Sequence, residues 1–428
     1  MLELIISKIN DFIWGVPFVS ILAILGIYLT IKLKMPQIKS FLSIKGLFSK
    51  EDKNSKITPF KALMSILAGT LGIGNITGVA SAIIIGGIGS IFWLFVSGFI
   101  AVAISYAENY LVLKNRKYDS KSGTYGGAMY ILDEVLEKRK IAELFCIFTL
   151  FATVGMGAMV QSNSLTKILT SNFSLSGTFV AITLTIIAGY IVLGGKYRIA
   201  KINSVLIPVC TIIYVCLCLG IIFLNIDNIG FALKNILLDA FGFKPVVGAV
   251  VGISIMKCIS TGFCSGMFSN EAGMGSAPIF SACTEEDKDV KKLSYIMSYS
   301  VFVDTIFLCV LTGITIAVSN SYMFPNVIDM LNNTFGTVPF GNILLIICMA
   351  VFVIATIPCW EFYGEQVIKF LFGKKYNMFL FKIIYLISVY FGCLLSINIV
   401  WDLSNISNAL MAIPNIYMIV KLRNTIES

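Results

Sequence analysis

The sequence contains eleven apolar stretches, each long enough to cross a lipid bilayer as an α-helix. They lie near residues 16–34, 58–78, 86–113, 142–169, 178–195, 202–224, 246–282, 294–318, 340–369, 380–398 and 403–420. Backbone N–H and C=O groups find no water inside a bilayer, so such stretches must satisfy these groups internally as helices. The sequence therefore predicts an all-α protein that crosses the membrane many times.

The amino-acid composition of the chain restricts the classes of function that it can have. Hydrophobic residues make up 57% of the chain and charged residues 13%, and no polar linker divides it, so we expect one transmembrane domain over residues 1–428. The chain has no histidine, and its 11 cysteines lie within or at the ends of apolar stretches without metal-type spacing. We therefore expect neither an enzyme nor a metal centre, an organic cofactor or a disulfide framework.

The basic residues predict the topology. Of the 32 Lys and Arg residues, 27 fall on alternate linkers, namely 32–61, 114–140, 196–201, 288–292, 369–382 and the tail after 421. The positive-inside rule places these linkers in the cytoplasm, with the N-terminus outside and the C-terminus inside the plasma membrane. The net charge of +9 is thus explained by topology and does not indicate nucleic acid as a partner. Residues 2–13 are expected to form a short helix in the membrane interface.

Two of the apolar stretches are interrupted by glycines and polar residues. The interruptions are Gly69-Thr70-Leu71-Gly72-Ile73-Gly74-Asn75 and Gly266-Met267-Phe268-Ser269-Asn270-Glu271-Ala272-Gly273-Met274-Gly275-Ser276. Broken helices at corresponding places in two halves of a membrane protein indicate a transporter whose site lies where the halves meet. We predict inverted five-helix repeats at 58–224 and 245–420. Residues 1–57 add the interfacial helix, an extra span and a basic linker.

The first interruption has groups suited to binding an amino acid. Gly72 and Gly74 let a ligand approach the backbone closely, while Thr70 and Asn75 add side-chain oxygens. The helix that starts near Asn75 presents unpaired N–H groups that favour a carboxylate. The alternative is that the small residues merely allow close helix packing.

Two acidic residues are expected at membrane depth, where a charge is costly. Glu271 lies in the second interruption, and Asp304 lies in the eighth stretch. Each either binds a cation or gates the path, or else braces the structure. Three further acids lie near cytoplasmic ends of spans, where we expect them to pair with Lys or Arg: Glu108, Glu361 and Glu365.

Three more polar or aromatic residues are candidates for the site. The amide of Gln161 can donate to a carboxylate and accept from an ammonium, or it can join two helices. Thr356 can offer its hydroxyl oxygen to Na⁺ beside carbonyls of the first interruption, or bond to its own helix. Trp360 can wall the pocket or lie in the interfacial aromatic belt.

At these residues the chain resembles the alanine or glycine:cation symporter family of the amino acid-polyamine-organocation superfamily. The motifs that carry the resemblance are Gly72-Ile73-Gly74-Asn75-Ile76 with Gly78-Val79-Ala80, Gly86-Gly87-Ile88-Gly89 with Phe92-Trp93, Met159-Val160-Gln161-Ser162-Asn163, Gly194-Gly195 with Arg198-Ile199, and Phe268-Ser269-Asn270-Glu271-Ala272-Gly273-Met274-Gly275-Ser276-Ala277-Pro278. The matches extend from about Pro36 through Glu365, and the last motif is the most diagnostic.

The resemblance implies a leucine-transporter-like 5+5 inverted repeat with one extra N-terminal span. It further implies inward symport of a small neutral amino acid, alanine or glycine, with Na⁺ or H⁺, and no obligate protein partner. Carried over by position, the substrate site comprises Thr70, Gly72, Gly74, Asn75, Gln161, Phe268, Ser269 and Trp360. The cation site comprises Gly69, Thr70, Asn75, Asn270 and Thr356.

The chain departs from the family pattern at three positions. Family members commonly have Thr or Val where Ile73 stands, Asn where Ala158 stands, and a basic residue where Ser265 stands. The first two changes alter size or polarity beside the predicted pocket. A transporter of the same fold that carries another solute, namely serine, glutamine or a nucleobase, therefore remains an alternative. An amino-acid-gated channel or transceptor is a further alternative.

Overall fold

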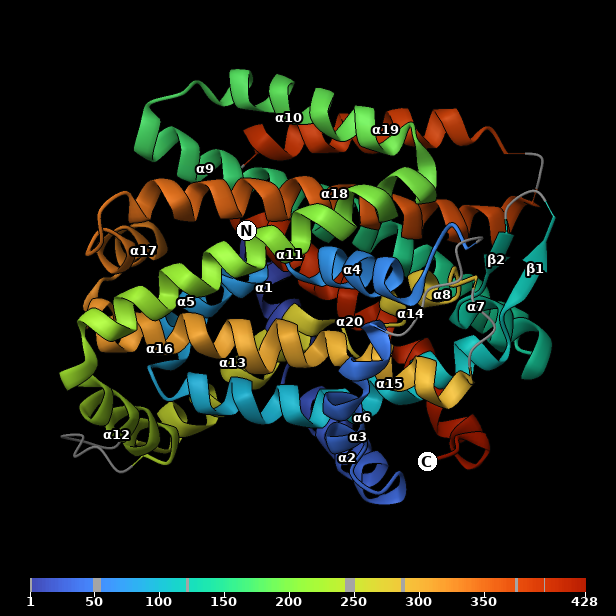
Figure 1. The fold of residues 1–428 in the computed structure, drawn as a ribbon, viewed down its shortest axis with the longest axis horizontal. Helices are drawn as coiled ribbons and strands as arrows, with labels where there is room; N and C mark the ends of the chain where they lie inside the picture. The colour runs from blue at the N-terminus through green and yellow to red at the C-terminus, as the bar shows by residue number, and fades with distance from the viewer. Residues whose placement is uncertain are drawn as a thin grey trace.

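The computed structural model describes residues 2–48, 55–120, 123–242, 251–285, 289–373, 376–395 and 397–428. Helices run roughly parallel across the molecule, and a short hairpin of β1 (Lys117–Asp119) and β2 (Gly123–Tyr125) lies at one end (Figure 1). In this view α18 (Gly341–Phe372) crosses nearly the whole bundle. The fold is therefore helical throughout its membrane part, as the apolar stretches predict.

A helix or an interrupted helix occupies each of the eleven predicted stretches. Uninterrupted helices are α2 (Val16–Lys32), α6 (Ser90–Lys114), α10 (Gly177–Val192), α11 (Gly195–Leu224), α18, α19 (Met378–Leu394) and α20 (Ile397–Leu422). Two spans contain π-helical turns: α8 (Arg139–Ala152), η4 (Thr153–Val160) and α9 (Gln161–Phe173), and α15 (Val290–Val301), η6 (Phe302–Cys309) and α16 (Val310–Val318). Six of the described helical segments are both long and apolar enough to cross a membrane unbroken, so the remaining spans are short, bent or broken.

The two predicted interruptions are real breaks. The first separates α4 (Pro59–Thr70) from α5 (Thr77–Gly86), with a single 3-10 turn η2 (Ile73–Asn75) between them. The second separates α13 (Val251–Asn270) from α14 (Ala277–Ser281). Gly273 and Gly275 have φ of +85° and +80° there, which a side chain would strain.

The structure corrects the lengths of the half-helices. The second span was expected to end near residue 78, but α5 continues to Gly86 and α6 begins only at Ser90. The seventh stretch is long enough for two half-helices around its break, and the second of them, α14, has only 5 residues. Apolar residues continue through both regions, so hydropathy alone could not locate these ends.

Shorter elements cap the bundle. They are α1 (Leu2–Ile13), α3 (Pro36–Ser43), η1 (Ile44–Phe48), α7 (Ala128–Tyr130), η3 (Ile131–Val135), η5 (Ile226–Asn228), α12 (Ile229–Ala240), η7 (Ser321–Met323), α17 (Val327–Phe335) and η9 (Arg423–Thr425). The predicted helix at residues 2–13 is thus present. In Figure 1, α12 and α17 lie at the left end of the bundle, opposite α7 and the hairpin.

The basic linkers gather at one end of the molecule. Arg116 donates to the carbonyl of Thr284 (3.0 Å) and Lys196 to that of Thr124 (3.1 Å), which joins three linkers. Lys291 pairs with Glu427 at 3.0 Å, and this hydrogen bond lowers the pKa of the Glu427 carboxyl. One shared basic end is what the alternation of charge predicts; its assignment to the cytoplasm stays a prediction.

Glycines let the second broken helix pack closely on α6. A Cβ added at Gly266 of α13 would lie 1.9 Å from Ser97 Oγ, and one at Gly262 would lie 2.3 Å from the carbonyl oxygen of Ser90. Because dispersion and hydrogen bonds hold membrane helices together, small residues that permit close approach stabilise the pair. This packing fixes α13, and with it the second break, against the core of the bundle.

Candidate functional site

The two breaks lie against each other inside the bundle. A Cβ added at Gly74 in the first break would be 3.9 Å from the Cα of Ser269 and 4.0 Å from Cδ1 of Phe268, at the end of α13. The predicted site side chains around this contact are at most 7% exposed. The backbones of the two breaks therefore lie side by side at Gly74 and Ser269.

A polar cluster joins the first break to α13 and η6. Asn75 Nδ2 donates to Asp304 Oδ1 at 2.7 Å and to the Asp304 carbonyl oxygen at 3.2 Å. Ser269 Oγ donates to the other carboxyl oxygen, Oδ2, at 2.9 Å. Asn75 Oδ1 is buried and has no hydrogen-bond partner among the described residues. The cluster therefore places a carboxylate beside an unused amide oxygen.

The π-helical turns of η6 shape this cluster. Cys309 lies five residues after Asp304, the spacing that a π-helix brings onto one face. Its Sγ accepts from Asn75 Nδ2 at 3.2 Å and lies 3.2 Å from Ser269 Oγ. Thr305 donates to Asp304 Oδ2 at 2.7 Å. Sequence reasoning missed Cys309 and Thr305, although the spacing to Asp304 was a readable signal once a π-helix is allowed.

Gln161 reaches the first break from the start of α9. Its Oε1 accepts from the backbone N–H of Ile73 at 3.1 Å, while its Nε2 is buried without a partner among the described groups. A Cβ at Gly72 would lie 2.6 Å from this Oε1, so only glycine leaves room for the amide. The interhelical hydrogen bond considered from the sequence is present, and one amide donor remains for a ligand.

The long helix α18 contacts the end of α4 through Thr356 and Trp360. Thr356 Oγ1 lies 2.7 Å from the carbonyl oxygen of Ala68 and 2.8 Å from that of Phe352, so its single hydroxyl hydrogen lies between the last turn of α4 and its own helix. Trp360 Nε1 donates to the carbonyl of Gly69 at 3.3 Å. Trp360 is fully buried, which excludes a place in an interfacial belt.

Residues of the second break brace their own turn. Glu271 has a φ of +56°, and its Oε2 accepts from Ser276 Oγ at 2.5 Å. Asn270 Nδ2 donates to the Gly266 carbonyl at 2.6 Å, and its Oδ1 accepts from the N–H of Ala272 at 3.0 Å. Both residues therefore form hydrogen bonds within or beside their own turn, and the role of Glu271 in gating or bracing stays a prediction. The predicted cation ligation by Asn270 stays a prediction, as does that by Thr70, whose hydroxyl lies 3.4 Å from the Leu67 carbonyl oxygen.

Glu108 was expected to pair with Lys or Arg, but it forms no such pair with the described residues. Its Oε2 accepts from the backbone N–H of Gly273 at 3.2 Å and from Asn415 Nδ2 at 2.9 Å, and its side chain is fully buried. The expectation was wrong because α6 places Glu108 beside the second break and not at the surface. Glu108 therefore ties α6 and α20 to the unwound backbone.

Only one of the two acids on α18 forms the expected ion pair with lysine. Glu365 pairs with Lys369 at 2.5 Å and with Lys382 at 3.3 Å, which confirms the prediction for this residue. Glu361 is fully buried one turn earlier, and neither carboxyl oxygen has a hydrogen-bond partner among the described groups. The predicted pairing of Glu361 was wrong, because the nearby lysines bond to Glu365.

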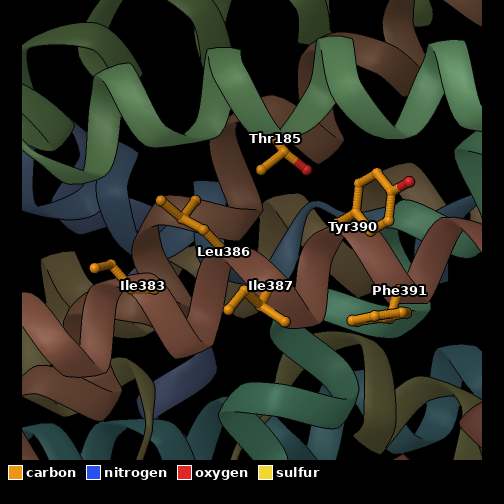
Figure 2. Close-up of a pocket in the computed structure, with 6 residues that line it drawn as sticks. All are labelled: Thr185, Ile383, Leu386, Ile387, Tyr390 and Phe391. Carbon is orange, nitrogen blue, oxygen red and sulfur yellow. The ribbon is translucent and has the colours of Figure 1, made fainter.

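Two grooves on the outside of the bundle include none of the predicted site residues. One, of about 300 Å³, lies between α10 and α19 and is lined by Thr185, Ile383, Leu386, Ile387, Tyr390 and Phe391 (Figure 2). The other, of about 620 Å³, lies at the basic end of α10 and α11. The first is almost wholly apolar, as a lipid-facing surface should be. Neither is the interior site.

Comparison with known proteins identifies the family. The model described as the sodium:alanine symporter family matches residues 1–428. The sodium/alanine symporter AgcS of Methanococcus maripaludis is 33% identical, and the match covers 99% of this chain and 95% of that protein. The probable sodium/glutamine symporter GlnT of Bacillus subtilis is 31% identical, and the match covers 100% of this chain and 89% of that protein.

A solved structure shows the same fold. The crystal structure of MhsT in complex with L-phenylalanine superposes with a TM-score of 0.57 at 15% sequence identity, covering 85% of this chain and 88% of that chain. The predicted leucine-transporter-like fold is thereby confirmed. The chain is a multi-pass membrane transporter and not an enzyme. It belongs to the sodium:alanine symporter family and is a Na⁺-coupled amino acid symporter.

Proposed function

We propose that this protein imports a small neutral amino acid, alanine or glycine, together with Na⁺ by alternating access. The observation that carries the proposal is the contact between the two broken helices beside two unused amide atoms, Gln161 Nε2 and Asn75 Oδ1. Such unpaired polar atoms are costly inside a bundle unless a ligand satisfies them. A zwitterion that offers one acceptor group and one donor group matches them.

The two ends of the amino acid are assigned by hydrogen-bond chemistry. Gln161 Nε2 can only donate, so it faces the carboxylate, which the N–H groups at the start of α5 also attract. Asn75 Oδ1 can only accept, so it faces the ammonium or a cation. Backbone dipoles thus replace water around both charges without placing an additional full charge in the membrane.

The surroundings favour a small substrate side chain. Phe268 and Trp360 are both buried beside the breaks, and their rings would limit the length of a substrate side chain. The name of the relative AgcS, a sodium/alanine symporter, supports the same substrate class.

The first proposed Na⁺ position is at the end of α4. Thr356 Oγ1 and the carbonyl oxygens of Ala68 and Gly69 converge there, and hard cations prefer oxygen ligands. Thr356 would exchange its hydrogen bond to Ala68 for a shared ion. The predicted ligand Thr70 follows directly in the chain.

The Asp304 cluster is the second proposed Na⁺ position. Asp304 supplies the negative charge, and Ser269 and Asn75 supply neutral oxygens. In the present orientation Asn75 Oδ1 is left for the ammonium, and only a rotation of the amide by 180° would turn it toward an ion beside Asp304. The rotated amide would point Nδ2 at the ammonium, so Asn75 serves one of the two at a time.

The driving force is sufficient for uptake. Moving one positive charge down a potential of 100 mV is worth about 2.3 kcal/mol, or roughly 50-fold accumulation. In the proposed cycle, α4–α5 and α13–α14 move together against the other helices and expose the site alternately. The N-terminus lies outside and the C-terminus in the cytoplasm.

Radiolabelled uptake into proteoliposomes tests the proposal. We expect alanine to accumulate against its gradient when Na⁺ is higher outside, and not when only a pH gradient is imposed. Accumulation driven by a pH gradient alone would show that the coupling ion is H⁺ and not Na⁺. Equilibration without accumulation would indicate a channel. If serine, glutamine or a nucleobase competed more strongly than alanine, that solute would be the preferred substrate.

A further inference from the structure

The groove at the basic end of α10 and α11 combines fixed positive charge with apolar surface. It has a volume of about 620 Å³ and is lined by Tyr190, Tyr197, Arg198, Lys201, Ile202, Val205 and Leu206. Two of these residues are basic and none is acidic. The groove opens on the outer surface of the bundle, where Tyr190 and Val205 are 67% and 61% exposed.

Local geometry holds the Arg198 guanidinium in this groove. Its Nη1 donates to the Tyr190 carbonyl at 2.5 Å, and its Cζ lies 4.7 Å from the centre of the Tyr190 ring. A Cβ added at Gly194 would lie 2.1 Å from Arg198 Nε, so glycine there lets the side chain fold back over the turn. Most of the five guanidinium donors remain available, because these contacts use few of them.

The two positive charges have no acidic partner among the residues that the structure describes. Lys201 lies one helical turn after Arg198 and is exposed, and within the described part of the chain neither residue forms an ion pair. Glu285 borders the groove through Tyr197, whose Oη donates to it at 3.1 Å, and it also accepts from the Lys56 N–H at 2.8 Å. The groove therefore retains a net positive charge that an anionic ligand can neutralise.

An apolar track leads from the charges toward the middle of the bundle. Val205, Val209 and Ile212 are 61%, 54% and 63% exposed and follow one another at spacings of four and three, so they form one outer stripe of α11. Arg198 and Lys201 precede this stripe on the same helix. A molecule with an anionic head and a long apolar chain matches both parts.

We propose that this groove binds an anionic phospholipid, with the phosphate between Arg198 and Lys201 and an acyl chain along Val205 and Val209. Basic pockets at the cytoplasmic ends of membrane helices attract anionic head groups, and each basic residue near the surface contributes. The inference is independent of which amino acid or ion the protein transports. A zwitterionic lipid carries an extra cation that Arg198 and Lys201 disfavour.

The test compares retained lipid on purified full-length protein by native mass spectrometry. The protein is incubated with dioleoyl phosphatidylglycerol or dioleoyl phosphatidylcholine, which have the same acyl chains. We expect wild-type protein to prefer phosphatidylglycerol, and Arg198→Gln/Lys201→Gln to bind it about 30-fold more weakly. The matched control Lys138→Gln/Lys140→Gln removes two exposed charges from the same end and should bind as wild type.

Two further arms separate a lipid from free phosphate. Glycerol 1-phosphate should not compete at concentrations where phosphatidylglycerol saturates, and Val205→Asn should weaken lipid binding while Arg198 and Lys201 are intact. Equal competition by glycerol 1-phosphate would overturn the lipid assignment. Equal loss in the Lys138→Gln/Lys140→Gln control, or no preference over phosphatidylcholine, would overturn the site itself. Size-exclusion profiles and retained Na⁺-driven uptake show that each variant is folded.

Discussion

The ring of Phe268 in the candidate site lies against the ring of Trp401 on α20, with centroids 5.7 Å apart and planes inclined by 31°. The same end of α20 is tied to the N-terminal segment, because Trp14 Nε1 donates to the Asn405 carbonyl at 2.8 Å. Asn10 Nδ2 also donates to Asp402 Oδ1 at 3.2 Å. Trp401 thus packs on Phe268 beside the N-terminal segment, and we predict that this aromatic pair closes the candidate site.

Trp401→Ala should weaken that closure. Loss of an aromatic pair removes roughly 1 kcal/mol, so we expect the apparent KM for the amino acid to rise about fivefold with little change in heat stability. Initial uptake rates over a range of substrate concentrations measure this. Phe391→Ala on the outer face of α19 is the control and should leave KM unchanged. An unaltered KM in Trp401→Ala would exclude the closure role.

Asp304→Asn should impair Na⁺ dependence. The substitution keeps the size of the side chain but removes the charge that Asn75 and Ser269 contact. Hydrogen bonds to charged groups are worth about 1.5–3 kcal/mol, so we expect the Na⁺ concentration for half-maximal binding to rise on the order of tenfold or more. Scintillation proximity binding with titrated Na⁺ measures it. Wild-type Na⁺ dependence would show Asp304 to be a brace only.

Gln161→Ala should abolish amino acid binding while the protein stays folded in the membrane. The change removes the Nε2 donor proposed for the carboxylate and the bond to the Ile73 N–H. Gly72→Ala should act in the same way without touching Gln161 directly, because its Cβ would displace the amide. Equilibrium binding of labelled alanine reports both effects. Asn75→Ala should likewise abolish binding, and unchanged affinity would remove that residue from the pocket.

Substitutions of Glu108 and Glu361 should have different effects on the stability of the protein. Glu108→Ala leaves the Gly273 N–H and the Asn415 amide unpaired, so we expect a loss of roughly 2–4 kcal/mol and a clearly lower melting temperature in detergent. Glu361→Leu removes a buried carboxyl that bonds to no described group, so stability should stay constant or rise. The opposite order of the two melting temperatures would contradict these assignments.

The orientation in the membrane can be tested with single cysteines. Lys138 lies at the basic end and Lys234 lies on α12 at the other end, and both positions are exposed. We propose the substitutions Lys138→Cys and Lys234→Cys. In right-side-out vesicles, a membrane-impermeant maleimide should label position 234 and leave position 138 unlabelled until the membrane is opened. The reverse pattern would invert the proposed topology.

The sequence predicted the spans and the two breaks, because these depend on local hydropathy and on glycine. It also predicted that the breaks meet, because they lie at corresponding places in two halves of the chain. It did not predict the partners of Glu108 and Glu361, because which helix faces an acid is decided by tertiary packing. Cys309 was missed for a related reason. An ordinary helical turn would have placed it away from Asp304.

The widened turns of η6 bear on how relatives are to be aligned. Each residue of an α-helix advances the side chain by about 100°, so removing one residue from this stretch would swing Asp304 away from Asn75 without changing its identity. A homologue with the same aspartate but one residue fewer would lack the contact between this carboxyl and the first break. The length of this segment is thus as informative for an alignment as the identity of the residue at position 304.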